Sequence, residues 1–196
     1  YYFSQHGGRK VAAFTVDAAH ATVSQFAGLP VLVFDEAQRR LPPATHDLFV
    51  AVGYSQFNLG RKRVVEQAQA LGYALPSFVH ESAVVAHNVG LGVNCMVREL
   101  AAVSPFACLG DGVIVGMQVG VSHHARIGNH AWLSAGCVVC GSANVGERCF
   151  IGANATVSTK VSFAAGCIIG AGALIMSDCA ADGVYAATPT QRRVRS

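Results

Sequence analysis

The fold of this chain is decided by the stretch VSHHARIGNHAWLSAGCVVCGSANVGERCFIGANATV, which runs from residue 121 to residue 157. A bulky apolar residue stands at every sixth position, and a small residue follows four positions after each bulky one. Val121, Ile127 and Leu133 begin the bulky series, and Ala125 and Ala131 begin the small one. A six-residue period matches neither a helix nor an alternating strand. It predicts short strands joined by tight corners in a coil that repeats itself.

The same register extends outward from this stretch in both directions, from Val79 to Ile175 without a break. Three hexads make one triangular coil of eighteen residues, and stacked coils are expected roughly 4.8 Å apart, like paired strands. Residues eighteen apart therefore lie one above another, and no long loop is expected to leave this prism. Glycines that directly follow bulky positions, such as Gly128 and Gly152, are expected where a side chain would crowd the turn. Because a single coil cannot bury its apolar face, stability comes from stacking.

Residues 1–77 lack this period, and short apolar runs there alternate with polar, helix-compatible segments. The pattern predicts a partial Rossmann-like α/β domain, with a small parallel sheet, in front of a solenoid domain and C-terminal tail over residues 78–196. We expect strands at 10–16, 29–34, 48–52 and 75–79, and a helix over 59–71 that Asn58 caps and Gly72 ends. Tyr1 stands in what resembles the middle of a helix, so a first strand and its glycine-rich loop are expected before it.

The composition excludes several classes of protein. Hydrophobic residues make up 52% of the chain, yet no stretch approaches the eighteen or more apolar residues of a membrane-spanning helix. A net charge of +3 is too small to indicate nucleic-acid binding, and the arginines near the end of the chain predict a solvated tail.

Seven cysteines in a chain of this length do not resemble a disulfide framework, and four of them occupy the small inward position of the repeat. They are expected to be core residues in a reducing, cytoplasmic setting. Cys137 and Cys140 have the spacing of a redox pair, but the hexad register places them in different environments.

Polar residues with possible chemistry fall in two places. Parallel sheets bind ligands at the carboxyl ends of their strands, where Asp17 and the pair Gly53 and Tyr54 are predicted to stand. The alternative is that Asp17 opens a turn and Gly53 makes room for one. In the solenoid, His123, His124 and His130 cluster on consecutive hexads. The last two occupy the fourth position of their hexads, where a solvent-facing histidine would need no function.

The hexads, of the form Leu/Ile/Val-Gly-x-x-small-x, resemble the left-handed β-helix of hexapeptide-repeat acyltransferases. With the α/β domain in front, nearly the whole chain resembles sugar acyltransferases of the NeuD and PglD type. The segments that carry the resemblance are 13–17, 49–53, 123–128 and 149–154. It implies a left-handed coil and transfer of an acyl group, most simply acetyl, from acetyl-CoA to an amino or hydroxyl group of a nucleotide-linked sugar.

The resemblance also assigns roles to residues. His123, two positions after a bulky residue, matches the general base of the family, because an imidazole takes up a proton near neutral pH. A carboxylate often follows that base, but here His124 follows, so either histidine is a candidate. Gly141, eighteen residues after His123, matches the glycine whose N–H holds the oxyanion.

Cofactor and substrate contacts follow from the same resemblance. Acetyl-CoA is expected along a groove near Trp132, Ala153 and Ala171, with His130 as a further contact, although PglD-type enzymes have a histidine where Trp132 stands. The solenoid cations Arg126, Arg148 and Lys160 either meet CoA phosphates or are simply solvated. The sugar or nucleotide is expected at Asp17, Gly53 and Tyr54. The family implies a homotrimer with sites between two chains, and no metal, nucleic acid or membrane insertion is expected.

Two other functions compete with this one. Some left-handed β-helices are γ-class carbonic anhydrases with three zinc-binding histidines, and His87 lies two coils before His123 in the same column. Gly128 stands where the third ligand would fall, so the zinc pattern is incomplete. A non-catalytic scaffold is the other alternative, and it predicts no effect when His123 is replaced.

Overall fold

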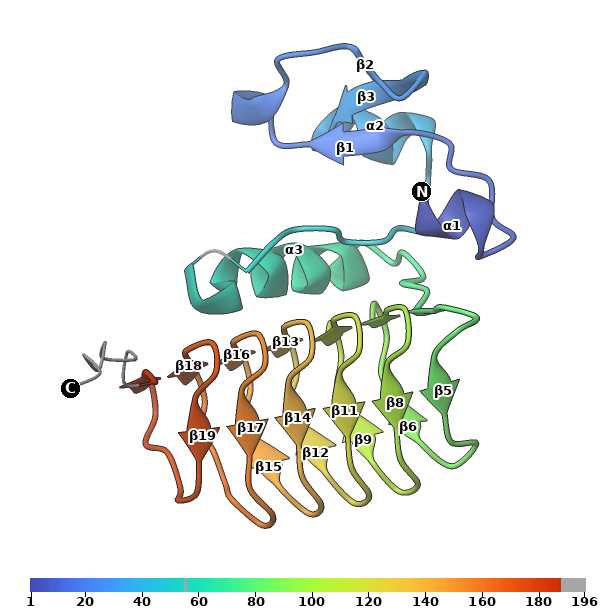
Figure 1. Cartoon of the computed structure of the whole chain (residues 1–196). Helices are drawn as coiled ribbons and strands as arrows, with labels where there is room; N and C mark the ends of the chain where they lie inside the picture. The colour runs from blue at the N-terminus through green and yellow to red at the C-terminus, as the bar shows by residue number, and fades with distance from the viewer. Residues whose placement is uncertain (55, 188–196) are drawn as a thin grey trace, which may run out of the picture.

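The computed structural model describes residues 1–54 and 56–187, and most of it is a parallel β-helix of two-residue strands (Figure 1). Its strands form three parallel sheets, which we call the seven-stranded, six-stranded and four-stranded sheets. The seven-stranded sheet contains β4 (Phe78–Val79), β7 (Met96–Val97), β10 (Ile114–Val115), β13 (Trp132–Leu133), β16 (Phe150–Ile151), β18 (Ile168–Ile169) and β20 (Val184–Tyr185). The six-stranded sheet contains β5 (Val84–Val85), β8 (Ala102–Val103), β11 (Gly120–Val121), β14 (Val138–Val139), β17 (Thr156–Val157) and β19 (Leu174–Ile175). The four-stranded sheet contains β6 (Gly90–Leu91), β9 (Cys108–Leu109), β12 (Arg126–Ile127) and β15 (Asn144–Val145).

The eighteen-residue register predicted from the hexads is confirmed on all three sheets. Gly120 of β11 pairs with Val138 of β14, and the other two sheets show the same spacing. Only the last coil is shorter, since Ile168 of β18 lies opposite Val184 of β20. The shorter spacing begins after Ile175, where the series of bulky residues ends.

Both apolar series of the repeat point inward. From Cys95 to Ala173 the bulky and the small positions are buried, whereas Val79 and Leu91 of the first coil remain 40% and 38% exposed. The crowding predicted after bulky positions is also confirmed. A Cβ added to Gly128 would lie 2.6 Å from the Glu147 backbone nitrogen, because the next coil passes directly above it.

The cysteines behave as core residues, as predicted. Cys137 is fully buried and Cys140 is only half-buried, so the two thiols have different environments despite their spacing. All seven cysteines are free thiols, and burial raises the pKa of the Cys137 and Cys149 thiols to about 12.

The first 75 residues form a small, irregular α/β layer over one side of the prism (Figure 1). Its elements are α1 (Tyr2–Gln5), β1 (Phe14–Val16), the 3-10 turn η1 (Ala18–His20), β2 (Gln25–Phe26), β3 (Leu29–Val33), α2 (Phe34–Arg40), the turn η2 (Gln56–Asn58) and α3 (Leu59–Ala70). Strands β1 and β3 are parallel, and β2 adds to β3 as an antiparallel hairpin. Among the described residues no helix has the length and apolar character to cross a bilayer. The predicted tail over 188–196 lies outside the described residues.

The strand predicted over 48–52 was wrong, because this extended segment joins no sheet. At its start Leu48 N–H donates to Ala74 O at 3.0 Å. In its centre the buried side chain of Asn94, from a corner of the β-helix, accepts the Val50 N–H at 2.7 Å and donates to the Val50 carbonyl at 3.2 Å. A single side chain thus replaces the neighbouring strand and ties the segment to the β-helix.

The helix predicted over 59–71 is confirmed as α3, which lies along the prism, and Gly72 ends it in a left-handed conformation with φ +84°. The predicted cap was wrong: Asn58 makes no side-chain hydrogen bond to the start of its own helix. Its Nδ2 instead donates to the Arg148 carbonyl at 3.1 Å, in the solenoid.

Arg61 attaches α3 to the prism and is fully buried. Its Nη2 donates to the His130 carbonyl at 2.5 Å, and its guanidinium lies 5.2 Å from the centroid of the Trp132 ring. Nε and Nη1 find no hydrogen-bond partner within the described residues, and burial lowers the pKa of Arg61 to about 10. Lys62, beside it, bonds Glu147 at 2.6 Å. The guanidinium stays charged at neutral pH and is stabilised by the His130 carbonyl, a longer bond of 3.5 Å to the Ala131 carbonyl, and one aromatic face.

Replacing Arg61 with alanine is expected to lower the free energy of unfolding by about 3 kcal/mol, because it leaves a large cavity and an unsatisfied carbonyl. Arg63 is exposed on the same helix, so Arg63→Ala is the matched control and should change the stability little. Urea denaturation of both variants measures the difference. Equal midpoints would show that Arg61 does not anchor the helix.

Candidate functional site

The residues predicted to catalyse the reaction meet at one edge of the prism, which we call the histidine corner. It lies between the six-stranded and four-stranded sheets and includes residues 122–125 and 140–143. His123 is exposed there, and a Cβ placed on Gly141 would lie 2.8 Å from both Cε1 and Nε2 of its ring. The stacking of His123 on Gly141, predicted from the eighteen-residue spacing, is therefore confirmed.

His124 lies beside His123 and contacts it directly. Their Nδ1 atoms are 3.1 Å apart with rings nearly perpendicular, and His124 also stacks on Phe106 of the preceding coil at 4.9 Å. One of the two Nδ1 atoms must carry the proton that they share. If it belongs to His123, the His124 Nδ1 accepts it and the His123 Nε2, beside Gly141, keeps a free lone pair. The neighbouring imidazole then orients the ring in place of a carboxylate.

Gly141 also has a free donor. At the matching hexad position of another corner, between the four-stranded and seven-stranded sheets, a side chain of the next coil accepts the backbone N–H, as Asn129 does from Asp111 at 3.0 Å. The Gly141 N–H makes no hydrogen bond within the described residues. Thr159 stands one coil beyond it. The His123 imidazole and the unpaired Gly141 N–H thus lie on successive coils of one corner, and acyl transfer to an amine requires a base and an oxyanion donor that are close together.

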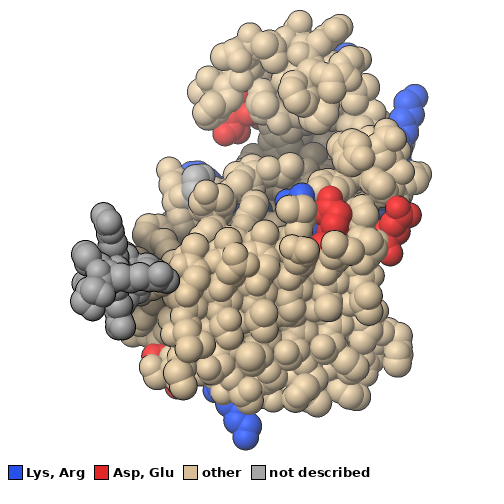
Figure 2. All heavy atoms as spheres, in the orientation of Figure 1, with Lys and Arg blue, Asp and Glu red and all other residues tan. Residues whose placement is uncertain are grey.

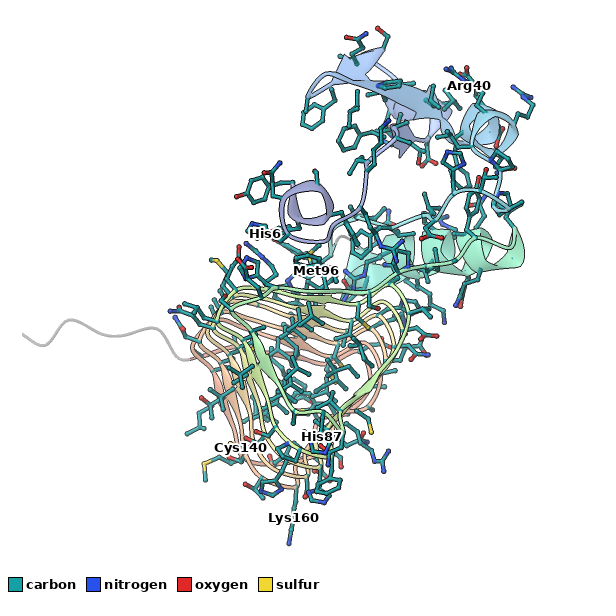
Figure 3. The ribbon with its side chains drawn as sticks, turned by 90° about the vertical axis from the view of Figure 1, so that its right-hand side faces the viewer. His6, Arg40, His87, Met96, Cys140 and Lys160 are labelled. Carbon is teal, nitrogen blue, oxygen red and sulfur yellow. The ribbon has the colours of Figure 1, made fainter. Side chains whose placement is uncertain are left out.

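His87 and Lys160 lie on the same edge of the prism, in coils before and after the histidine corner. Figure 3 shows both at the side of the prism remote from His6 and Arg40. His87 is exposed and two coils from His123. Within the described residues, the group of side chains close enough to share a metal ion includes neither histidine.

Ala153 and Ala171 lie at a different corner, between the seven-stranded and six-stranded sheets. They stand one above the other, since the Gly172 N–H donates to the Ala153 carbonyl at 2.8 Å, and both are at least partly exposed. The six-stranded sheet separates this alanine corner from the histidine corner.

Trp132 and Tyr54 pack against each other on the seven-stranded sheet, below the α/β layer. Their ring centroids are 5.3 Å apart, and Tyr54, which is 56% exposed, also contacts Phe150 at 4.8 Å. Gly53 is exposed with no atom within 4 Å of an added Cβ, so its surroundings leave space. The sequence predicted Gly53 and Tyr54 at the carboxyl end of a sheet strand, but the structure places Tyr54 against the solenoid.

A cavity of about 240 Å³ lies next to this pair. Val52 and Val50 form one side, Met96 and Trp132 the other, and Arg98 adds a cation. No pattern in the sequence indicated Arg98, which directly follows β7 as another residue follows every strand of the coil.

Tyr2 closes the same cavity from helix α1. Its hydroxyl donates to Glu99 Oε1 at 2.7 Å and accepts from Arg98 Nη2 at 2.7 Å. Burial and the bond to Glu99 raise the pKa of this hydroxyl. Arg98 is thus held in place by an ordered network.

The two remaining candidates lie apart from the histidine corner. Asp17 is exposed after β1 and begins η1 through its carbonyl, which accepts His20 N–H at 2.8 Å, so the turn reading is confirmed for its backbone. His130 is not solvent-facing: it is 4% exposed beneath α3, and burial beside Arg61 lowers the pKa of its ring. Its Nδ1 has no partner within the described residues.

Of the cations proposed for CoA phosphates, Arg126 and Lys160 are exposed, and Lys160 stands two coils from His124 in its column. Arg148 is 19% exposed and lies 3.9 Å from Glu147, with its carbonyl bonded to Asn58. Arg126 and Lys160 therefore remain available to an anion, and Arg148 is committed to the contact with α3.

Comparison with known proteins agrees with this geometry. A family model described as bacterial transferase hexapeptide (six repeats) matches residues 124–159. The acetyltransferase domain of PglB from Neisseria gonorrhoeae FA1090 is 30% identical, with a TM-score of 0.82 over 91% of this chain and 85% of that one. The structure of the same domain in complex with acetyl coenzyme A is 28% identical, with a TM-score of 0.85 over 96% of this chain and 90% of that one. A search of curated proteins found no significant match.

A second relative is PerB from Caulobacter crescentus, in complex with CoA and GDP-perosamine. It is 30% identical, with a TM-score of 0.75 over 94% of this chain and 86% of that one. These matches confirm the fold class, an α/β region followed by a left-handed parallel β-helix. The chain therefore belongs to the hexapeptide-repeat sugar acetyltransferases, which use acetyl-CoA.

Proposed function

We propose that this enzyme transfers the acetyl group of acetyl-CoA to the amino group of a nucleotide-linked sugar, with His123 as general base. The observation that carries the proposal is the His123 imidazole lying against Gly141, whose N–H has no partner among the described residues. The solved relatives support the substrate class, since one is bound to acetyl coenzyme A and another to CoA and GDP-perosamine.

The reaction that fits this corner is direct attack. The sugar nitrogen bonds to the thioester carbonyl carbon while the His123 Nε2 takes a proton from that nitrogen. The carbonyl oxygen becomes an oxyanion and accepts the Gly141 N–H. When the intermediate collapses, the carbon–sulfur bond breaks and CoA leaves as its thiol after protonation. His124 contributes by accepting the His123 Nδ1–H, because this fixes the tautomer with a free Nε2.

We assign sugar-nucleotide binding to the cavity between the α/β layer and the seven-stranded sheet. Gly53 and Tyr54 directly follow Val52, which lines the cavity, and Tyr54 packs against Trp132 of its wall. Arg98 supplies a cation for a phosphate. Asp17 stands exposed at the end of β1, where a ligand of the α/β layer would lie.

The histidine corner is remote from this cavity within one chain, so we propose that each site forms between two chains of a homotrimer. The six-stranded sheet supports this arrangement because its outward residues have no charged side chain. Val84, Val138 and Leu174 on it are 72%, 37% and 62% exposed. Figure 2 shows this side of the prism almost free of charged residues. Burying it against a second copy brings the histidine corner of one chain toward the alanine corner of the next, where Ala153 and Ala171 would line the acetyl-CoA groove. The free thiols fit a reducing cytoplasm.

Placing a charge on this face is expected to disperse the trimer. Val138→Lys puts an ammonium group at the centre of the six-stranded sheet, and an unpaired buried charge is strongly unfavourable. We expect monomers by light scattering and at least a tenfold loss of acetyl transfer. Asn144 is exposed on the four-stranded sheet, so Asn144→Lys is the matched control and should keep the trimer and the activity. A Val138→Lys variant that remains trimeric and active would place the interface elsewhere.

The test of the proposed function is release of free thiol from acetyl-CoA with a panel of nucleotide-linked amino sugars and their hydroxyl analogues. We expect release that depends on the sugar, is stoichiometric with acetylated product by mass spectrometry, and is confined to the amino series. Release with the hydroxyl analogues alone would contradict N-acetylation. No release with any sugar would contradict the assignment as a nucleotide-sugar acetyltransferase.

A further inference from the structure

A second cluster of chemically competent side chains lies where helix α1 meets the first coil of the β-helix. It consists of His6, at the end of α1, and the adjacent pair His80 and Glu81, which follows β4. Each of the three residues offers a ligand atom, and these atoms all lie within 4.8 Å of one another. Figure 3 shows His6 above the prism, on the side opposite to His87 and the histidine corner. The cluster takes no part in the reaction proposed above.

The side chains of the cluster converge on one point. The ring centroids of His6 and His80 are 4.7 Å apart, and His6 Nδ1 lies 3.4 Å from Glu81 Oε1. An ion pair between His6 and Glu81 accounts for one of these contacts. It does not account for a second imidazole beside the first, because two imidazoles that share one carboxylate compete for its charge. A cation that accepts lone pairs from all three groups satisfies the whole arrangement.

His80 is positioned as metal-binding histidines usually are, with one nitrogen engaged by a neighbouring polar group. Its Nδ1 lies 2.9 Å from Ser82 Oγ, and that hydroxyl oxygen already accepts the Leu100 N–H at 3.1 Å. Nδ1 also accepts the Ser82 N–H at 3.2 Å. Metal binding through Nε2 requires the proton on Nδ1, where Ser82 Oγ accepts it with its second lone pair, and the contact with the Ser82 N–H is then given up. The rings of Tyr2 and Phe78 pack around the imidazole at 6.2 Å each and hold its plane.

We propose that His6, His80 and Glu81 bind one zinc(II) ion, with water completing a four-coordinate site. Two imidazoles and a carboxylate are a donor set that zinc favours. Tetrahedral bonds of about 2.1 Å place ligand atoms roughly 3.4 Å apart, so small side-chain rotations close the site. The Glu81 side chain is 76% exposed and free to make them. The ion joins α1 to the first coil, and it thereby fixes Tyr2 and its bonds to Arg98 at the cavity.

The test is metal binding by the intact chain after chelator treatment. Zinc titrated by calorimetry is expected to bind at one equivalent, and cobalt(II) is expected to give the visible absorption of a tetrahedral site. His80→Ala and Glu81→Gln should each weaken binding at least tenfold. His20→Ala, which removes an exposed histidine elsewhere, should leave binding unchanged.

Two further measurements keep the outcome interpretable. The metal-free Tm of Glu81→Gln should equal that of the original chain, since this side chain is exposed, while the rise in Tm that zinc causes should be lost. The double variant His123→Ala, His124→Ala tests the other imidazole pair and should bind as before. Binding that is absent in the original chain, unaffected by His80→Ala, or lost only in the double variant would overturn the site.

Discussion

Replacing His123 with alanine is expected to lower kcat/KM for acetyl transfer by about 10²- to 10⁴-fold, the usual contribution of a general base. The imidazole is exposed and lies against Gly141 outside the core, so the Tm and the oligomeric state should be unchanged. The KM for acetyl-CoA should change little, because His123 acts on the attacking nitrogen and not on the thioester in the ground state. Steady-state rates of thiol release at saturating sugar measure the effect.

The matched variant is His124→Ala, because the two histidines are adjacent and both exposed. If His124 only orients His123, its removal should cost roughly tenfold, well below the loss at His123. His124→Asn keeps an acceptor in reach of the His123 Nδ1–H and suits the left-handed backbone at φ 59°, so it should recover part of the rate. A larger loss at His124 than at His123 would reverse the assignment of the base. Equal rates in all variants would place the reaction away from both histidines.

Replacing Gly141 with alanine is expected to reduce kcat by about 10²- to 10³-fold without unfolding the protein, because both the base and the oxyanion donor are disturbed. The added Cβ would stand 2.8 Å from the His123 Cε1 and Nε2 atoms. Since the exposed imidazole can rotate away from the added methyl group, we expect little loss of stability but a displaced base. The same methyl group covers the N–H that the oxyanion needs.

Gly90→Ala provides the control for this substitution. Gly90 is exposed on β6 of the four-stranded sheet, away from the face proposed to meet a second chain, and the nearest atom to an added Cβ is Cys108 Sγ at 3.5 Å. Its activity and Tm should match those of the original chain. Full activity in Gly141→Ala would show that the reaction occurs away from the histidine corner. Unfolding of Gly141→Ala alone would show that the glycine is required for packing.

Between them, the hexads predicted the coil, its register and the contact between His123 and Gly141. This succeeded because every coil repeats the same local geometry, so a spacing in sequence is also a distance in space. In the α/β layer no repeat relates a spacing in sequence to a distance in space. The segment over 48–52 has the apolar composition of a strand, but its hydrogen-bond partner is the side chain of Asn94, which no local pattern identifies.

Arg61 illustrates the same limit. It stands four and seven residues before Val65 and Ala68, so it falls on the buried stripe of α3, yet its charge favours the solvent. Its burial is made possible by the carbonyls of His130 and Ala131 and the face of Trp132, which the solenoid brings beneath it.

The sequence by itself determined the prism, its inward residues and the column that joins His123 to Gly141, because a repeat converts local periodicity into global structure. The tertiary structure alone decided where the α/β layer rests, which aromatic pair borders the cavity, and that His6 meets His80 and Glu81. Those contacts join segments with no shared period, and they depend on which surfaces are complementary once the coil has formed.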